Sequence, residues 1–97
     1  MDMSCKSQLA IVLPSLNPDK KFGAVVDGLL KSGFENIVIV DDGSEEHEQH
    51  WFNWAAESSQ CHVLHHGVNK GKGRALKTAF EYVLKNLPDV KGVITID

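Results

Sequence analysis

The sequence has little cysteine, no long apolar run and no block of like charge, and each absence excludes a class of protein. The two cysteines, Cys5 and Cys61, lie far apart and match no metal-site spacing. The longest apolar runs, residues 9–14 and 37–40, are far too short to span a bilayer. The start of the chain lacks the layout of a signal peptide. We therefore expect a cytoplasmic protein, and leave open whether a longer parent associates with a membrane.

The charge is weak and spread along the chain. The formal net charge is −3, and the lysines are scattered rather than clustered. Nothing therefore suggests electrostatic binding to nucleic acid or to a membrane surface. With 42% apolar and 24% charged residues, the composition is that of a soluble globular protein. At 97 residues, the chain forms one small domain at most.

Five histidines raise the question of a metal site, above all in the run Cys61-His62-x-x-His65-His66. On a strand, successive side chains point to opposite faces. His62 and His66 would then share one face, while Cys61 and His65 share the other. The four side chains cannot converge on one ion, so we interpret the run as an ordinary strand.

Four short apolar runs predict strands. They are rich in valine and isoleucine and are bounded by Pro, Gly, Asn or Asp. Runs without polar alternation, such as "AIVL" and "IVIV", are typical of strands covered on both faces. The expected strands are residues 9–13, 36–41, 61–65 and 92–97.

Three helical patterns lie between these strands. The first has Asn17 as a cap, Pro18 in the first helical position and Gly33 as a left-handed end. The second covers about residues 45–57 and has Ser44 as its N-cap. The third covers about residues 73–86. Apolar residues with helical spacing predict the inward faces: Phe22, Val25, Val26, Leu29 and Leu30 in the first helix; Trp51, Phe52, Trp54 and Ala55 in the second; Leu76, Ala79, Phe80, Val83, Leu84 and Leu87 in the third.

The order of elements is therefore βαβαβαβ, which predicts an α/β fold with an open parallel sheet. Right-handed crossovers limit the topology, and the expected strand order is 3-2-1-4. This is the first half of a Rossmann-like, doubly wound nucleotide-binding fold. Ligands of such sheets bind at the carboxyl ends of the strands, beside the point where the strand order reverses.

Acidic residues gather at that edge. Asp41 and Asp42 close the second strand within "IVDDGS", and Asp97 ends the fourth. Carboxylates there can accept hydrogen bonds from a base or ribose, or hold a divalent cation. Taken alone, Asp42-Gly43-Ser44 favours a turn and helix cap over a ligand site. The segment "NKGKGR" matches neither a Walker loop nor a dinucleotide fingerprint, and alone it could be a solvated basic turn.

Taken together and in this order, the segments resemble one known family. "IVLPSLN", "IVIVDDGS", "HHGVNKGKGRALKTAF" and "GVITID" are similar to the nucleotide-binding half of glycosyltransferase family 2, which has the GT-A fold. The most similar subgroup is the dolichyl- or polyprenyl-phosphate sugar transferases. The resemblance covers residues 9–97 and leaves residues 1–8 as an N-terminal extension. It implies transfer of a sugar from a nucleotide-diphosphate donor to an acceptor such as a polyprenyl phosphate.

The resemblance also implies where the nucleoside lies. The segment of Pro14, Ser15 and Leu16 would border the base and ribose. Asp42 would accept a hydrogen bond from a ring N–H of the base, and Asp41 would support that loop.

The diphosphate would lie near the third loop. Lys72 and the neighbouring Gly71 would approach the nucleoside or the diphosphate. Asp97 would be the first acid of the Asp-x-Asp motif, in contact with the ribose or with the Mg²⁺ or Mn²⁺ that bridges the diphosphate.

The chain departs from the family pattern Pro-x-Tyr-Asn-Glu-Glu and stops within the next motif. Leu16 replaces the aromatic residue and Pro18 the first acid, which leaves uridine and guanosine both open. Because the chain stops at Asp97, the second acid, the acceptor site and any catalytic base would lie beyond it. We therefore expect a truncated part of a longer enzyme, without transferase activity of its own. We also expect it to self-associate through Val93, Ile94 and Ile96 on the edge strand.

Two other classes of function share this architecture. A receiver domain would place its acid pair after the first strand and a lone acceptor Asp after the third, where this chain has Pro-Ser and histidines. A nucleotidyltransferase would need a glycine-rich loop directly after the first strand, and that loop is missing. The sequence favours the glycosyltransferase over both.

Overall fold

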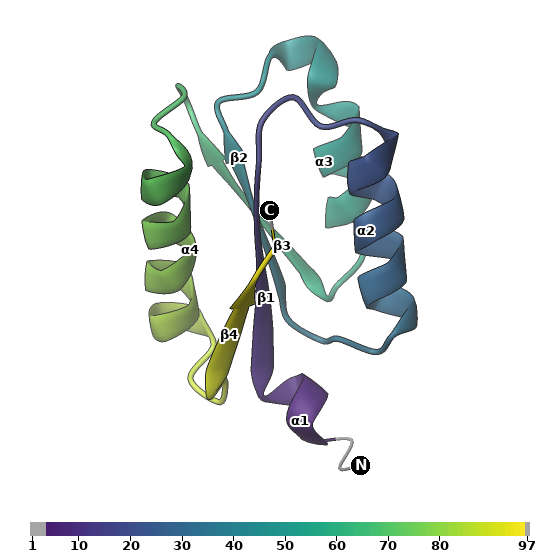
Figure 1. Ribbon diagram of the computed structural model, residues 1–97, viewed down its shortest axis with the longest axis vertical. Helices are drawn as coiled ribbons and strands as arrows, with labels where there is room; N and C mark the ends of the chain where they lie inside the picture. The colour runs from purple at the N-terminus through teal and green to yellow at the C-terminus, as the bar shows by residue number, and fades with distance from the viewer. Residues whose placement is uncertain (1–3, 97) are drawn as a thin grey trace.

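Four parallel strands form one sheet in the computed structural model, which describes residues 4–96 (Figure 1). The strands are β1 (Leu9–Ser15), β2 (Ile37–Asp42), β3 (Cys61–His66) and β4 (Gly92–Thr95). Their order is β3-β2-β1-β4, and every neighbouring pair is parallel. The predicted α/β fold and the strand order 3-2-1-4 are confirmed.

Helices cover both faces of this sheet. The helices are α1 (Ser4–Ser7), α2 (Lys20–Lys31), α3 (His50–Ala56) and α4 (Lys72–Asn86), with a 3-10 turn at Glu46–Glu48 before α3. Figure 1 shows α2 and α3 on one side of the sheet and α4 on the other. The single turn α1 lies in the segment predicted to precede the domain. No helix within residues 4–96 is long and apolar enough to cross a membrane.

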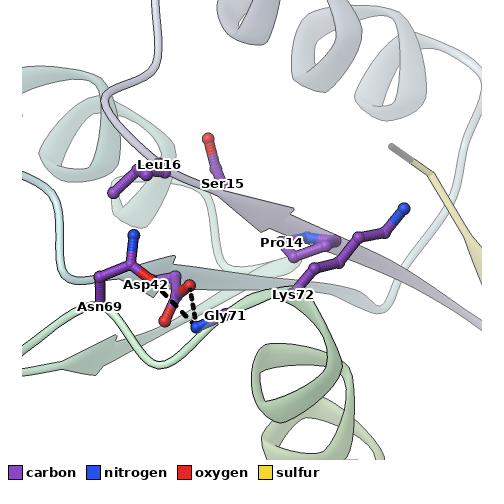
Figure 2. A pocket seen from close by; sticks show the side chains of 7 residues that line it. All are labelled: Pro14, Ser15, Leu16, Asp42, Asn69, Gly71 and Lys72. Carbon is purple, nitrogen blue, oxygen red and sulfur yellow. Dashed lines mark hydrogen bonds between the residues drawn. The ribbon is translucent and has the colours of Figure 1, made fainter.

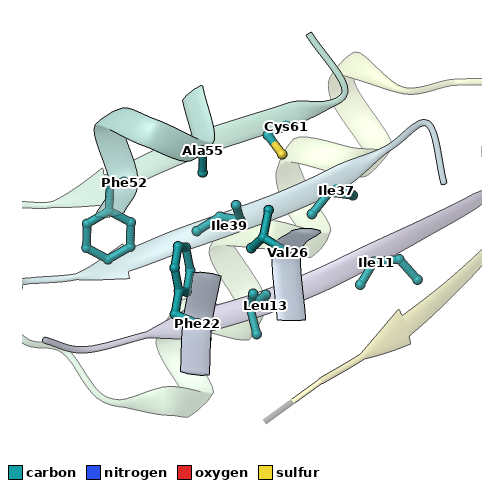
Figure 3. Close-up of a cluster of buried hydrophobic side chains, with 9 residues drawn as sticks. All are labelled: Ile11, Leu13, Phe22, Val26, Ile37, Ile39, Phe52, Ala55 and Cys61. Carbon is teal, nitrogen blue, oxygen red and sulfur yellow. The ribbon is translucent and has the colours of Figure 1, made fainter. Parts of the chain in front are cut away.

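The sheet has an apolar core on each face. All six residues of β2 are buried, as the continuous run "IVIV" predicted. Alternate residues of β1 and β2 point to opposite faces, so each face receives its own cluster. Toward α2 and α3 the cluster contains Ile11, Leu13, Phe22, Val26, Ile37, Ile39, Phe52, Ala55 and Cys61 (Figure 3). Toward α4 it contains Ala10, Val12, Val38, Val40, Ala75, Ala79 and Val83.

The start of α2 differs from the prediction. The helix begins at Lys20 rather than Pro18, and its N-cap is Asp19, whose carboxylate accepts a first-turn backbone N–H. Asn17 cannot serve as the cap because its side chain accepts a hydrogen bond from Glu45, 28 residues away. The predicted left-handed end at Gly33 is confirmed by its φ of +89°.

The second helical segment is also different, because it is not one continuous helix. A 3-10 turn at Glu46–Glu48 precedes α3. Ser44 does not cap this segment, since its hydroxyl accepts the backbone N–H of Asn17 instead. Phe52 is completely buried, whereas Trp54, also predicted to point inward, is exposed.

The inward stripes of α2 and α4 are narrower than predicted. On α4 the buried line is Ala75, Ala79 and Val83, spaced by one helical turn. Phe80 and Leu84 each lie one residue further, about 100° around the helix, and Leu84 is 82% exposed. Val25 on α2 is exposed for the same reason. The predictions for these three residues were wrong because apolar spacing alone does not show how much of a helix the sheet covers.

The strand β4 lies at one edge of the described sheet. Val93 and Ile94 are exposed there on opposite faces, whereas Ile96 packs against the core beside α2. Asp97 lies outside the described residues. Self-association through this edge stays a prediction.

Candidate functional site

A pocket opens where β1 and β2 end and α4 begins (Figure 2). Its volume is about 250 Å³, and it is lined by Pro14, Ser15, Leu16, Asp42, Asn69, Gly71 and Lys72. The fold therefore brings together six of the eight residues predicted for the site. Asp41 does not line this pocket, and Asp97 lies outside the described residues. The predicted contacts of all eight with a ligand stay predictions.

The Asp42 carboxylate in the pocket wall accepts three hydrogen bonds. One carboxylate oxygen, Oδ1, accepts hydrogen bonds from His66 Nδ1 at 2.8 Å and from the backbone N–H of Lys70 at 2.9 Å. The other, Oδ2, accepts the backbone N–H of Gly71 at 3.0 Å. The Asp42 side chain is only 8% exposed. These three bonds tie the loop that leads into α4 to the end of β2.

Asp41 faces the other side of the sheet. Its Oδ1 accepts the backbone N–H of Ser44 at 2.8 Å, and its Oδ2 accepts from His65 Nδ1 at 2.8 Å and from Gln49 Nε2 at 2.9 Å. Successive residues of a strand alternate in direction, so the two carboxylates point apart. Asp41 thus supports the turn after β2, as predicted, from behind the pocket.

Hydrogen bonds hold the pKa of both aspartates below the ordinary value. For Asp41, burial raises the pKa, but hydrogen bonds from His65, Gln49 and Ser44 outweigh it and lower the pKa below 3.8. For Asp42, burial again raises the pKa, and bonds from His66, Lys70 and Gly71 lower it below 3.8. The hydrogen bonds stabilise the charged carboxylate more than burial destabilises it.

We expect acid to destabilise the fold through these two carboxylates. A group whose pKa is lower in the folded state stabilises the fold fully above its unfolded pKa, and this contribution is lost as the pH falls through the folded value. The contribution of the two carboxylates to the free energy of unfolding should therefore hold down to about pH 4 and then decline, below the pH range affected by the lowered pKa of the partly buried His62. Urea titrations between pH 7 and pH 2.5 measure this. A free energy of unfolding that stays level down to pH 2.5 would contradict the hydrogen bonds assigned to the Asp41 and Asp42 carboxylates.

Gly43 allows the turn after β2 to touch the loop before α4. Its φ is +80°, a conformation that side chains disfavour. A Cβ built on Gly43 would lie 2.5 Å from the carbonyl carbon of Val68 and closer still to the amide nitrogen of Asn69. The backbones of the two loops are therefore in direct contact at Gly43. This contact places Asp42 within hydrogen-bonding distance of the Lys70 and Gly71 N–H groups.

Asn17 and Ser44 join the loops after β1 and β2. The backbone N–H of Asn17 donates to Ser44 Oγ at 2.8 Å, and Asn17 Oδ1 accepts the backbone N–H of Glu45 at 2.9 Å. Asn17 takes a positive φ of 48°, which asparagine tolerates better than most residues. This reciprocal pair fixes the strand end that carries Ser15 and Leu16 beside the pocket.

Lys72 lies at the start of α4 in the pocket wall. The N-cap of α4 is Gly71, with a φ of +92°, and Lys72 is the first helical residue. In Figure 2 the Lys72 side chain extends beside Pro14. An ammonium group and the N-terminus of a 15-residue helix at one wall favour a negatively charged ligand group.

Sequence reasoning missed three residues of this region: His65, His66 and Asn69. The histidines pair with the aspartates because β2 and β3 are parallel in a register that aligns Asp41 with His65 and Asp42 with His66. An alignment of the two predicted strands could have indicated both pairs. Asn69 lines the pocket and accepts the Gly71 N–H through Oδ1 at 3.0 Å. Its position inside "NKGKGR" was the available signal.

A metal ion was predicted at Asp97 alone, and Asp97 lies outside the described residues. Among residues 6–96, whose side chains the structure describes, no three His, Cys, Asp or Glu side chains are grouped so that they could hold an ion. His62 bonds to the Tyr82 hydroxyl and His66 to Thr78, both on α4, whereas His65 faces α3. His62 and His66 therefore point to one face of the sheet and His65 to the other, as predicted.

The chain is similar to known proteins over most of its length. A family model described as glycosyl transferase family 2 matches residues 10–90. A Methanocaldococcus jannaschii protein described as "Uncharacterized protein MJ1222" is 34% identical over 92 residues, which cover 95% of this chain and 35% of the relative. The chain thus spans about a third of the length of that relative.

One solved structure shares the fold. It is the mannosyltransferase PcManGT from Pyrobaculum calidifontis in complex with GDP-Man and Mn²⁺, with a TM-score of 0.67 and 18% sequence identity. The match covers 77% of this chain and 24% of that protein. At this identity the likeness concerns the fold, which is that of a GT-A enzyme. Since the family model covers most of the sequence, the chain belongs to glycosyl transferase family 2.

Proposed function

We propose that this chain binds the nucleotide-diphosphate donor of a sugar-transfer reaction. The observation that carries the proposal is the pocket at the carboxyl edge, where the loops after β1 and β2 meet the start of α4. Family membership supports the reaction type. The donor's base lies between Leu16 and Asp42, and its diphosphate extends toward Lys72.

Asp42 contacts the base through the one lone-pair position of its carboxylate that no protein donor occupies. A carboxylate offers about four lone-pair positions, and His66, Lys70 and Gly71 occupy three of them. The remaining position accepts a ring N–H. Uracil, thymine and guanine carry such a group, whereas adenine and cytosine do not. The resemblance to the family implies that the hydrogen-bond donor is a ring N–H, so we propose that the base is one of the first three.

Lys72 and the N-terminus of α4 bind the diphosphate. Its negative charge is stabilised by the ammonium group and by the positive end of the helix dipole at the first turn. The Gly71 N–H, by contrast, is already bonded to Asp42 and Asn69. The glycine leaves the mouth of the pocket open, since nothing lies within 4 Å of where its Cβ would be.

The metal and the acceptor belong to the longer enzyme that we propose. The resemblance to the family puts Mg²⁺ or Mn²⁺ at Asp97, and such an ion would neutralise the charge of the leaving diphosphate. The sugar passes to an acceptor such as a polyprenyl phosphate, and this acceptor binds, together with the catalytic base, outside this chain. Donor binding without transfer is thus the activity proposed for the 97 residues themselves. A cytoplasmic location stays a prediction.

Calorimetric titration with a panel of nucleotide sugars tests this proposal. We expect the chain, with Mn²⁺ or Mg²⁺ present, to bind a UDP-, dTDP- or GDP-sugar and to bind ADP- and CDP-sugars much more weakly. The physical reason is that adenine and cytosine lack the ring N–H proposed to donate to the remaining acceptor position of Asp42. Equal binding of all five would contradict the role of Asp42, and no binding of any would contradict donor binding by this chain.

A further inference from the structure

We infer that His66 is a positioning residue of the pocket, which fixes the Asp42 carboxylate and, through it, the backbone of Lys70 and Gly71. His66 does not line the pocket, so it acts only through Asp42. The inference rests on the proposed donor-binding function, because it assigns the residue that keeps this pocket in shape.

Both ring nitrogens of His66 have partners. Nδ1 lies 2.8 Å from Asp42 Oδ1, and Nε2 lies 2.9 Å from Thr78 Oγ1. An ionised carboxylate can only accept, so Nδ1 carries a hydrogen and donates it. The side chain is 8% exposed. Because the ring cannot rotate without losing both bonds, its orientation is fixed.

This fixed ring connects three elements. His66 ends β3, Asp42 ends β2, and Thr78 lies on α4. The carboxylate that His66 holds is the same one that accepts the Lys70 and Gly71 N–H groups at 2.9 and 3.0 Å. Without the histidine, Asp42 could turn about its side-chain bonds, and the two backbone donors would lose their aligned acceptor.

His62 offers a matched control on the same strand and the same face. Its Nδ1 bonds to the Tyr82 hydroxyl of α4 at 3.0 Å. The bond therefore joins β3 to α4, as the His66–Thr78 bond does, but it involves no pocket residue. Loss of the His62 bond therefore shows how a weaker contact between β3 and α4 affects the pocket when the bonds of Asp42 are kept.

Two substitutions separate the two bonds of His66. In His66→Asn, the side-chain amide can donate from the position of Nδ1, which keeps the bond to Asp42 and loses Thr78. In His66→Gln, the longer amide reaches the position of Nε2, which keeps Thr78 and loses Asp42. A positioning role therefore predicts that Asn preserves the pocket better than Gln.

Hydrogen exchange of backbone amides, followed by NMR, tests the inference without any ligand. We expect His66→Gln to speed the exchange of the Lys70 and Gly71 amides about tenfold, relative to Val38 in the core of β2. His62→Gln should leave both amides close to wild type. His66→Asn loses only the Thr78 bond, so its exchange should lie between wild type and His66→Gln. Unchanged exchange of the two amides in His66→Gln would overturn the inference.

Binding of the nucleotide sugar found in the calorimetric panel gives the second readout. We expect an affinity about tenfold weaker in His66→Gln and within about threefold of wild type in His66→Asn. Weaker binding with unchanged Lys70 and Gly71 exchange would also overturn the inference. If the wild-type chain binds no nucleotide, the proposed function fails, and the exchange experiment still decides the role of His66.

A further variant covers the case in which His66→Gln does not fold. Thr78→Val keeps His66 but removes the bond that stops its ring from turning. Faster exchange of the Lys70 and Gly71 amides in this variant, with His62→Gln unchanged, would support the inference. Exchange as slow as in wild type would overturn it.

Discussion

Replacement of Gly43 by alanine is expected to lower the free energy of unfolding by about 2–4 kcal/mol. The alanine would have to adopt a φ of +80°, and its Cβ would overlap the backbone of Val68 and Asn69. The chain can relieve the overlap only by separating the two loops, which breaks the Lys70 and Gly71 bonds to Asp42. Thermal unfolding should show a midpoint on the order of 10–20 °C lower.

Two glycines of the facing loop, between β3 and α4, provide graded controls. Gly71 also has a positive φ, of 92°, but nothing lies within 4 Å of its Cβ position. Its ψ is 159°, so Gly71→Ala should cost only the backbone strain, about 1–3 kcal/mol. Gly67 has neither a close neighbour nor a positive φ, so Gly67→Ala should change the free energy of unfolding by less than about 0.5 kcal/mol. Equal effects of all three would contradict the close approach at Gly43.

Replacement of Asp42 by asparagine is expected to weaken nucleotide binding about ten- to a hundredfold. The substitution keeps the shape but removes the charged acceptor, and a charge-assisted hydrogen bond is worth about 1.5–3 kcal/mol. It should also lower the free energy of unfolding by about 1–3 kcal/mol. Asparagine has one acceptor oxygen, so its amide nitrogen would face a donor, either the Gly71 N–H or the pair from His66 and Lys70. Calorimetric titration and urea unfolding measure the two effects.

Asp41→Asn separates the loss of the base acceptor from the loss of stability. Asp41 also accepts three hydrogen bonds, but on the other face of the sheet and outside the pocket. Asp41→Asn should lower the free energy of unfolding by a similar amount and weaken nucleotide binding less than Asp42→Asn does. If Asp42 served only the turn, Asp42→Asn would leave nucleotide affinity as in wild type, and that result would contradict its assignment to the base.

The strands and their order could be predicted because their signals are local. A run such as "IVIV" at residues 37–40 is apolar without alternation, which is typical of a strand covered on both faces. The right-handed crossover rule then limits the topology, and the doubly wound fold supplies the expected order of the four strands without any contact being known. The position of the pocket follows, because the carboxyl ends of parallel strands share one edge. Pro14, Asp42 and Lys72 could therefore be predicted to lie together.

The inward faces of the helices were only partly predictable. Phe52 and Trp54 lie two residues apart, and both fit an apolar stripe. Which of them is buried depends on how α3 is rotated against the sheet, and the spacing does not give that rotation. The same holds for Phe80 and Leu84, which lie beyond the line along which α4 contacts the strands.

The sequence by itself determined the α/β class, the strand order and the edge that carries the site, because the period of apolar residues and the turn residues act over a few neighbours. Only the tertiary structure decided the hydrogen-bond partners of the site. Asp42 and His66 are 24 residues apart and meet through the register of β2 and β3. Asn17 and Ser44, each expected to cap its own helix, bond to each other's loops instead. A polar side chain takes the partner that the packed strands place within 3 Å, and no local pattern records that distance.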